Sequence, residues 1–444
     1  MIEDKQNQLI IYTFGCRMNE FESQCIYKIM KEIGMQKVVF VNTCAVTSES
    51  ERQVRQEIRK LHRDHQDYSI IVAGCASQLH SSVFQNIQGV EFIISNELKL
   101  QKWCYLEIND WLNDERNEND KLQIQQQLLI QTKNNITENK LQSNALDWEY
   151  LQDFEDRSRA FVPIQTGCDH FCSFCIVPFT RGKFHSYNPL HIIEQVKIFV
   201  KNGYSEVVLT GIDITDYGKD VRGQQEIDTL GKLCKVILAE TNLPRLRLSS
   251  VDVAEIDKDI MDLIANEPRF MPYFHISLQS GSDTVLKRMR RRHTRQDVID
   301  FCKNVLKKRP ESAFGADIIT GFPGETDDEF LQSIKIVKNA PITYIHAFPY
   351  SKRERTLASL MDDDVPKKIK KERVKELIQL GEKNLKLLYQ KMDGTIQKLL
   401  VERNGIARAE NFAKVITNNK EKYEFGKIVE TKVIFDGENL VVKK

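Results

Sequence analysis

Three cysteines near the middle of the 444-residue chain have a spacing that suits metal chemistry: Cys168, Cys172 and Cys175 form a Cys-x3-Cys-x2-Cys run. The run follows a strand-like segment, so the three thiolates share one short loop. Such a loop can hold three corners of a cubane iron–sulfur cluster, which leaves one iron open for a substrate or cofactor. The alternative is zinc, which usually binds two Cys-x2-Cys pairs or a mixture of cysteine and histidine. His170 is the only histidine inside the loop, and the spacing favours the open cluster.

A second group of three cysteines is spread over the first 100 residues, at Cys16, Cys44 and Cys75. Each follows an apolar, strand-like segment. These segments are 9–13, 38–43 and 69–73. Parallel strands end at one edge of their sheet, so the three thiols are expected to converge on a second open cluster site. The alternative is that they are packing residues, because buried cysteine is common in protein cores. The remaining cysteines fit neither group and are expected to be packing thiols: Cys25, Cys104, Cys234 and Cys302.

The elements that must position both groups alternate between strand and helix. Residues 1–100 have a β-α-β-α rhythm, with a helical pattern from Glu49 to Arg63, which predicts a parallel sheet covered by helices. The rhythm returns from Phe161 to about Tyr350. Six strand-like segments lie there: 161–164, 206–209, 245–248, 274–278, 315–319 and 344–348. A complete eight-stranded barrel needs ~250 residues, so this shorter region predicts a partial barrel with its active site at the carboxyl ends of the strands.

Two stretches have an unusual composition. Residues 105–147 contain eight Asn and six Gln without Gly or Pro, which predicts a solvated linker or insertion with some helix near Leu122 to Ile130. Residues 365–444 carry 19 basic and 11 acidic side chains, a net charge of +8. They begin with a basic helix to about Met392 and continue with about five short strands separated by turns, which predicts a small OB-like β-barrel.

The overall charge and hydropathy exclude several classes of protein. The chain has 64 basic and 63 acidic residues, so it is not a globally basic nucleic-acid binder. Its first residues lack the basic and apolar regions of a signal peptide, and no apolar run approaches the ~18 residues that span a bilayer. We expect a soluble, cytoplasmic protein with no membrane partner.

The central cysteine run, with an aromatic residue before its last cysteine and a partial barrel around it, resembles the radical S-adenosylmethionine superfamily. There the open iron binds S-adenosylmethionine, and one electron cleaves it to methionine and a 5′-deoxyadenosyl radical. Together with the N-terminal cysteines and the C-terminal barrel, the chain resembles the methylthiotransferase family over nearly its whole length. The matching segments are 13–19, 42–47, 72–75, 275–282 and 317–326. Asn42–Thr47 and Arg247–Ser250 resemble the branch that acts on N6-threonylcarbamoyladenosine.

The resemblance implies five parts along the chain. They are an N-terminal methylthiotransferase domain at 1–104, a polar linker at 105–157, a radical S-adenosylmethionine domain at 158–365, a connecting basic helix at 366–388 and a TRAM domain at 389–444. It also implies two [4Fe-4S] clusters, one on each group of three cysteines, with no catalytic residue beyond these ligands. S-adenosylmethionine would bind at the strand ends. The residues expected to contact it are Phe174, Thr210, Gly211, Ser249, Gln279 and Ser280.

The activity implied by the resemblance is methylthiolation of carbon 2 of N6-threonylcarbamoyladenosine at tRNA position 37. The implied partners are the anticodon loop of tRNA and an electron donor such as flavodoxin or ferredoxin. Because the threonylcarbamoyl group carries a carboxylate, a hydroxyl and a urea, its pocket should offer cationic and hydrogen-bonding side chains. The candidates are Arg17, Asn19, Thr47, Arg247 and Ser249. The alternatives are the same chemistry on N6-isopentenyladenosine or on a ribosomal protein aspartate, and a non-catalytic, zinc-containing RNA-binding protein.

Two groups of basic side chains are candidates for contacts with tRNA phosphates. Residues 287–293 form a basic run, and Arg52, Arg55 and Arg59 share one face of a helix. The alternative for both groups is a solvated surface.

Overall fold

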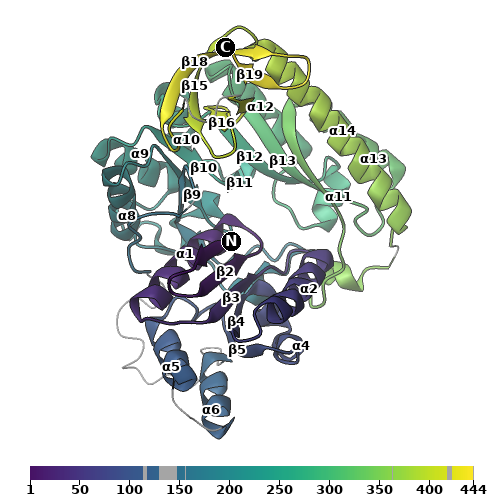
Figure 1. Cartoon of the computed structure of the whole chain (residues 1–444). Helices are drawn as coiled ribbons and strands as arrows, with labels where there is room; N and C mark the ends of the chain where they lie inside the picture. Colours follow the sequence, from purple (N-terminus) through teal and green to yellow (C-terminus); the bar gives the residue numbers. More distant parts are fainter. Residues whose placement is uncertain (114–117, 130–147, 156, 363, 418–422, 444) are drawn as a thin grey trace. The chain divides into compact units, whose positions relative to one another are not determined.

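The computed structural model of the chain describes residues 1–113, 118–129, 148–155, 157–362, 364–417 and 423–443. The chain divides into two compact units, each described here by itself (Figure 1). The first unit comprises Met1–Glu155, Thr166–Asp169 and Ile176–His191, and the second comprises Asp156–Gln165, His170–Cys175 and Ile192–Lys444. None of the described helices is both long enough and apolar enough to cross a membrane.

The first unit is built on a five-stranded sheet in which the strand order follows the chain order. Its strands are β1 (Ile2–Asp4), β2 (Leu9–Thr13), β3 (Val38–Thr43), β4 (Ser69–Gly74) and β5 (Val90–Ile94). Strands β2 to β5 are parallel, and β1 pairs with β2 in the antiparallel direction. Every residue of the central strand β3 is buried, as expected for a sheet covered on both faces. The predicted parallel sheet is confirmed.

Helices cover both faces of this sheet (Figure 1). They are α1 (Arg17–Glu32), α2 (Ser48–Asp64), α3 (Cys75–Leu79), α4 (Ser81–Gln85), α5 (Lys102–Asn113), α6 (Glu118–Leu129) and α7 (Val177–Arg181). Successive side chains of a strand point to opposite faces. Phe40 therefore shares a core with α1, α5 and α6, whereas its neighbours Val39 and Val41 share one with α2, α3 and α4.

The described part of the Asn/Gln-rich stretch differs from a solvated linker. Helices α5 and α6 bury Tyr105, Ile108, Ile124 and Leu128 in the core on one face of the sheet. The side-chain amide of Gln125 also exchanges two hydrogen bonds of 2.8 Å with the main chain of β5. A few apolar residues at helical spacing are thus enough to dock an otherwise polar helix. The helix expected near residues 122–130 is confirmed by α6, and the rest of the stretch lies outside the described residues.

The second unit contains the predicted partial barrel. Its strands are β6 (Ala160–Pro163), β9 (Glu206–Thr210), β10 (Arg245–Leu248), β11 (Ser250–Val251), β12 (Tyr273–Gln279), β13 (Ala313–Thr320) and β14 (Ile342–Pro349). They pair in parallel as β10-β9-β6 and β11-β12-β13-β14. Ser249 joins β10 to β11, and its main-chain N–H donates to the carbonyl of Leu209 in β9 (2.9 Å). Strands β10 and β11 therefore act as one strand that belongs to both sheets.

Helices alternate with these strands along the chain. They are α8 (Pro189–Lys201), α9 (Leu230–Glu240), α10 (Lys258–Asn266), α11 (Asp283–Arg288), α12 (Arg295–Lys308) and α13 (Asp327–Asn339). Thr294 and Thr326 begin α12 and α13 with capping boxes, in which each threonine and the acidic residue three positions later bond each other's main-chain N–H. Short 3₁₀ turns of the second unit lie at Ile214–Asp216, Lys219–Val221, Val253–Glu255 and Leu357–Leu360. Two further short strands lie at or beyond its boundary: β7 (Gln165–Thr166) begins in the second unit and ends in the first, and β8 (His185–Ser186) belongs to the first.

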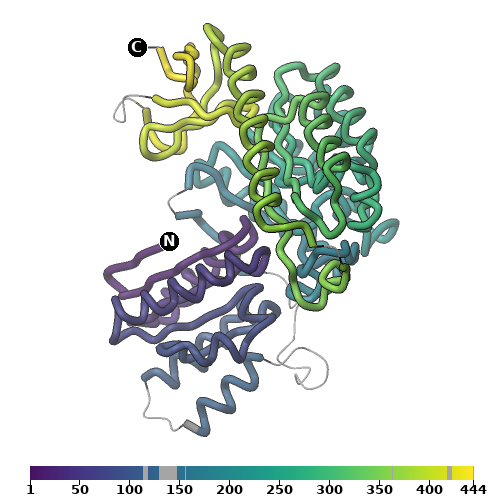
Figure 2. Tube along the Cα trace, turned by 90° about the vertical axis from the view of Figure 1, so that its right-hand side faces the viewer, coloured from purple at the N-terminus to yellow at the C-terminus, as the bar shows by residue number. Residues whose placement is uncertain are grey.

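A long helix and a small barrel complete the second unit (Figure 2). Helix α14 (Lys367–Met392) packs along β14, where the Asn384 side chain donates to the carbonyls of Val337 and Ile342 (3.0 and 2.8 Å). Five strands then close a barrel. They are β15 (Ile396–Val401), β16 (Ile406–Ala409), β17 (Lys414–Ile416), β18 (Ile428–Phe435) and β19 (Leu440–Val442). The predicted basic helix and C-terminal barrel are confirmed.

Candidate functional site

The three N-terminal cysteines lie at the carboxyl edge of the first sheet. Cys44 and Cys75 directly follow β3 and β4, whose last residues are register partners. Cys16 follows β2 and caps the start of α1. Gly15, at φ 102°, lies so close to Cys44 that a Cβ atom on it would be 3.0 Å from the cysteine Cβ and 3.1 Å from its Sγ. The parallel register therefore brings the three cysteines to one edge, as the sequence predicts.

The burial and charge of this edge suit a metal cluster. Cys16 is exposed, Cys75 is half-buried and Cys44 is 7% exposed. Burial raises the pKa of the Cys44 thiol to about 11, and the negative charges of the other two sulfur atoms add to this shift. Three thiolates repel one another unless positive charge lies between them, and iron accepts such soft ligands. The donor set fits the expected cluster.

Two asparagines contact the sulfur atoms of this edge. The Oδ1 atom of Asn19 lies 3.7 Å from Cys16 Sγ, and the Nδ2 atom of Asn96 lies 3.8 Å from Cys75 Sγ. Asn19 Nδ2 also donates to two main-chain carbonyls beside the ends of β2 and β3 (2.8 and 3.0 Å). Through these bonds Asn19 braces the cysteine edge. It is buried, whereas the sequence predicted that it lines a substrate pocket.

A buried ion cluster of Glu22, Lys99 and Arg181 lies behind these asparagines. Arg181 donates to both Glu22 carboxylate oxygens (2.8 and 3.2 Å), and Lys99 Nζ donates to Oε2 (2.6 Å). Each cation also holds one asparagine: Arg181 donates to Asn19 Oδ1 (2.6 Å) and Lys99 to Asn96 Oδ1 (2.8 Å). The exposed fractions of the three charged side chains are 6%, 1% and 4%.

The ion cluster carries one net positive charge beside three thiols. Burial opposes ionisation of Glu22, but the charges and hydrogen bonds of Arg181 and Lys99 outweigh it and lower the pKa of Glu22 to about 2. Sequence reasoning missed these residues, because they come from α1, from a turn after β5 and from α7. The only local signal is the spacing of Asn19 and Glu22, which places both on one face of α1.

The central cysteine run is divided between the two units. Cys172 and Cys175 belong to the second unit, where the Cys175 N–H donates to the Cys172 carbonyl (2.9 Å). Arg291 Nη1 lies 3.5 Å from Cys172 Sγ. Cys168 belongs to the first unit, and its N–H donates to the Gly182 carbonyl (3.3 Å). The grouping of all three thiols therefore stays a prediction from their spacing.

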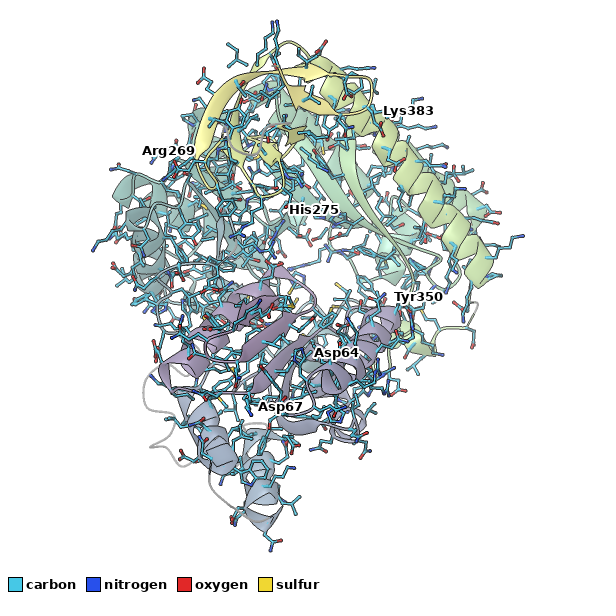
Figure 3. The ribbon with its side chains drawn as sticks, viewed as in Figure 1. Asp64, Asp67, Arg269, His275, Tyr350 and Lys383 are labelled. Atoms are coloured by element: carbon cyan, nitrogen blue, oxygen red, sulfur yellow. The ribbon has the colours of Figure 1, made fainter. Side chains whose placement is uncertain are left out.

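The loop that carries Cys172 and Cys175 is anchored near the carboxyl ends of β13 and β14. Ser173 bonds the main chain at the end of α11 through its N–H and its hydroxyl (3.0 and 2.9 Å). Phe174 packs against an apolar cluster that includes Phe322 and Tyr350, which follow β13 and β14 (Figure 3 labels Tyr350). A cofactor-binding loop is expected at this end of a partial barrel.

The other residues expected to contact S-adenosylmethionine lie at the same strand ends. Thr210 ends β9, Ser249 follows β10, and Gln279 ends β12 with φ 66°. The buried hydroxyl of Ser249 has no hydrogen-bond partner among the described residues. Gly211 has little room for a side chain, since a Cβ atom on it would be 2.8 Å from a side-chain carbon of Ile214. The structure thus aligns these residues along one edge, and Ser280 follows β12 there.

The two basic groups are largely occupied by ion pairs. In the run 287–293, Arg291 donates to Asp252 (2.6 Å), and its side chain is 8% exposed. His293 is buried. On α2, Arg52 and Arg55 pair with acidic residues one turn earlier. Arg291 and His293 therefore stabilise the fold instead of forming a solvated surface.

The position of Arg247 also differs from the expected one in a substrate pocket. It is 1% exposed, and its guanidinium donates to both carboxylate oxygens of Glu206, at the amino end of β9 (2.9 and 3.1 Å). Phe412 of the C-terminal barrel lies against this end. Its ring stacks on Tyr273 at 5.0 Å and lies 5.2 Å from the Arg247 guanidinium. The C-terminal barrel therefore closes the end of the partial barrel opposite the expected cofactor site.

Comparison with known proteins identifies the family. Residues 162–337 match the radical SAM superfamily, and residues 8–95 match the uncharacterized protein family UPF0004. The chain is 42% identical over 405 residues to a threonylcarbamoyladenosine tRNA methylthiotransferase MtaB from Rickettsia prowazekii, with 91% of this chain and 90% of the relative covered. The chain belongs to the threonylcarbamoyladenosine tRNA methylthiotransferase family. This methylthiotransferase uses S-adenosylmethionine and two [4Fe-4S] clusters, so the predicted cofactors are confirmed.

Further relatives have either the same name or the name of an enzyme for another tRNA base, and one solved structure is similar in fold. An MtaB protein of the same description from Bacillus subtilis is 31% identical, with 96% of this chain and 93% of the relative covered. A tRNA-2-methylthio-N(6)-dimethylallyladenosine synthase from Christiangramia forsetii is 27% identical, with 96% and 91% covered. Among solved structures, the radical S-adenosylmethionine methyltransferase TsrM from Kitasatospora setae matches with a TM-score of 0.53 at 12% identity over 77% of this chain and 74% of that chain. The similarity to TsrM supports only the fold of the methylthiotransferase, not its activity.

Proposed function

We propose that this methylthiotransferase acts on carbon 2 of N6-threonylcarbamoyladenosine at position 37 of tRNA. The observation that carries the proposal is the meeting of Cys16, Cys44 and Cys75 at one sheet edge in a chain that also contains the radical S-adenosylmethionine loop. Two cluster sites give the enzyme one centre for radical formation and one for sulfur. Identity to relatives named for threonylcarbamoyladenosine, at 42% and 31%, supports this base over the isopentenyl base.

We assign one group of three cysteines to each iron–sulfur cluster. Cys168, Cys172 and Cys175 would hold one cluster, and Cys16, Cys44 and Cys75 would hold the other. When bound, the clusters and S-adenosylmethionine supply the one-electron chemistry that activates an inert C–H bond. The protein's own residues position the reacting groups and exclude water. Asn19 and Asn96 orient two of the sulfur ligands. An external donor of the flavodoxin or ferredoxin type would supply the electron, in the cytoplasm where tRNA is modified.

The test is mass spectrometry of nucleosides from tRNA of a strain that lacks its own methylthiotransferases and expresses this chain. We expect 2-methylthio-N6-threonylcarbamoyladenosine and no methylthiolated isopentenyladenosine. Cys44→Ser serves as the inactive control, because it removes one proposed cluster ligand while keeping the residue small. The opposite nucleoside pattern would assign the enzyme to the isopentenyladenosine branch, and a product on ribosomal protein would refute a tRNA substrate.

We propose that α14 contributes to tRNA binding. Lys367, Lys371 and Lys375 are exposed and recur every four residues, so they form a stripe along one face of the helix. Lys370 and Arg373 differ, because they are buried and paired with acidic residues. These three ammonium groups make no ion pair with the part of the chain that the structure describes, and such a stripe suits a row of phosphates.

The stripe can be tested by substitution of charge instead of truncation. Removal of the chain after Val365 would expose Glu206 and its arginines at the end of the barrel, and would therefore disturb more than tRNA binding. We expect the triple change of Lys367, Lys371 and Lys375 to Gln to weaken tRNA binding and to flatten its salt dependence by about one unit of slope for each lost phosphate contact. The matched control changes three exposed α12 lysines to Gln: Lys303, Lys307 and Lys308. Equal effects of the two triple changes would contradict the proposal.

A further inference from the structure

A group of two histidines and one aspartate lies on three neighbouring strands of the partial barrel. His275 is on β12, Asp317 on β13 and His346 on β14 (Figure 3 labels His275). Asp317 Oδ1 lies 3.1 Å from His275 Nε2 and 3.4 Å from His346 Nδ1. Asp317 and His346 are register partners, so their side chains point to the same side of the sheet.

That side faces away from the covering helix. The next residue toward the amino end of β14, Ile345, packs on α14, where a Cβ atom added to Gly381 would lie 3.0 Å from its side chain. His346 therefore points to the opposite, inner side of the barrel. Gly315 makes room for the group, because any side chain there would collide with Tyr273 and His275.

An ionised Asp317 assigns protons to two of the histidine nitrogens. An ionised carboxylate only accepts hydrogen bonds, so His275 donates from Nε2 and His346 donates from Nδ1. Burial opposes ionisation of Asp317, but the two histidine bonds outweigh it and hold the pKa of that carboxyl well below its usual range. His275 Nδ1 then accepts from the Tyr273 hydroxyl (3.2 Å), which completes the bonding of this ring.

Two atoms of the group remain open to a ligand. Within the described residues, the bonds of Asp317 all use Oδ1, which leaves Oδ2 as an acceptor. The His346 side chain is 60% exposed, and its Nε2 makes no hydrogen bond to any of those residues, whereas the His275 side chain is 9% exposed. One ring is thus a buried support and the other presents an open nitrogen.

The group of Asp317, His275 and His346 lies below the cofactor end of the barrel. Asp317 and His346 each lie three residues before the ends of their strands, at Thr320 and Pro349. At ~3.3 Å per residue, that places them on the order of 10 Å below the edge where S-adenosylmethionine is expected. A base held at this edge can therefore extend a substituent toward the group.

We propose that Asp317 and His346, supported by His275, form the subsite for the threonylcarbamoyl group of the substrate; the proposal rests on the proposed function. Asp317 Oδ2 accepts a hydrogen bond from a urea N–H, and His346 Nε2 bonds the threonyl part, through its hydroxyl or carboxylate. An isopentenyl group could satisfy neither atom. A site built to bond a polar substituent rejects the analogue that lacks it, because its own polar groups are then left unpaired.

The experiment compares two forms of one tRNA, with and without the threonylcarbamoyl group on adenosine 37, in binding to the holoenzyme. The measured quantity is the ratio of the two affinities. We expect wild-type enzyme to prefer the modified tRNA by about tenfold or more, and His346→Leu and Asp317→Asn to bring the ratio close to one. His346→Gln, which keeps a polar side chain, should retain part of the preference. Ile345→Val, on the outer side of β14, should leave the ratio unchanged.

A general folding defect would weaken binding of both tRNAs by the same factor, so the ratio still reports the subsite in the folded fraction. An unchanged ratio in His346→Leu and Asp317→Asn therefore overturns the subsite. If wild-type enzyme makes the methylthiolated threonylcarbamoyl product while the variants keep the ratio, only the subsite is wrong. If wild-type enzyme makes no such product, the proposed function fails and the subsite falls with it.

Discussion

Replacement of Arg181 by methionine tests whether the buried ion cluster stabilises the cysteine edge. Arg181 is 4% exposed and makes three hydrogen bonds, two to Glu22 and one to Asn19. Methionine keeps much of the side-chain length but removes the charge. Loss of one partner from a buried ion pair costs about 3–5 kcal/mol. Because Lys99 still bonds Glu22 at 2.6 Å, we expect a loss near the lower limit, about 3 kcal/mol of unfolding free energy.

Tryptophan fluorescence can follow this loss in the first unit alone. All three tryptophans of the chain, Trp103, Trp111 and Trp148, lie in Met1–Glu155. Urea unfolding of protein without its iron–sulfur clusters, followed by this fluorescence signal, therefore reports the unit that contains the ion cluster. As a control, Arg52→Met removes an exposed arginine whose ion pair is with Glu49 of the same helix, and we expect little change.

A double-mutant cycle separates the ion pair from the packing of the side chain. Glu22→Gln with Arg181→Met removes both charges, so no unpaired carboxylate remains in the core. We expect the double variant to lose at least about 1 kcal/mol less than the sum of the two single losses. A loss below about 0.5 kcal/mol for Arg181→Met, or simple additivity in the cycle, would refute the argument that these charges support each other.

The remaining predictions concern the iron–sulfur clusters, the pH dependence of stability and the end of the partial barrel that Phe412 closes. Cys168→Ala should abolish cleavage of S-adenosylmethionine and leave the iron of the N-terminal site in place, whereas Cys44→Ala should allow cleavage but stop product formation. Measurements of iron content, cofactor cleavage and tRNA nucleosides check both expectations. Normal product formation by Cys44→Ala would contradict the assignment. The pKa of Glu22 is lowered from 4.5 to about 2 by folding, so its contribution to stability is complete above pH 4.5 and is lost as the pH falls toward 2. The fluorescence-monitored unfolding free energy should therefore fall over this range in wild type and fall less steeply in Glu22→Gln; equal slopes would count against the shift. Phe412→Ala should destabilise the second unit by about 2–3 kcal/mol in calorimetry, because it removes a ring stacked on Tyr273 and its contacts with buried guanidinium groups.

Much of the fold could be predicted because its signals are local. The strands that end in Cys44 and Cys75 are short apolar runs, and parallel pairing requires their ends to meet at one edge. The basic helix that starts near Lys367 and the five short strands after it are equally visible in periodicity and turn residues. The docking of α6 could not be predicted from the Asn/Gln-rich composition, because composition averages over a segment, whereas this docking depends mainly on Ile124 and Leu128.

The sequence by itself determined the chemistry of the enzyme: two groups of three thiols, a partial barrel and a basic C-terminal part. Only the tertiary structure decided what supports that chemistry. Glu22, Lys99 and Arg181 form one ion cluster although 159 residues separate the first from the last. Arg247 is a buried structural residue because Glu206 and Phe412 meet it from other elements. Spacing along the chain reports neighbours within a helix or strand, whereas the partner of a buried charge is set by how separate elements pack.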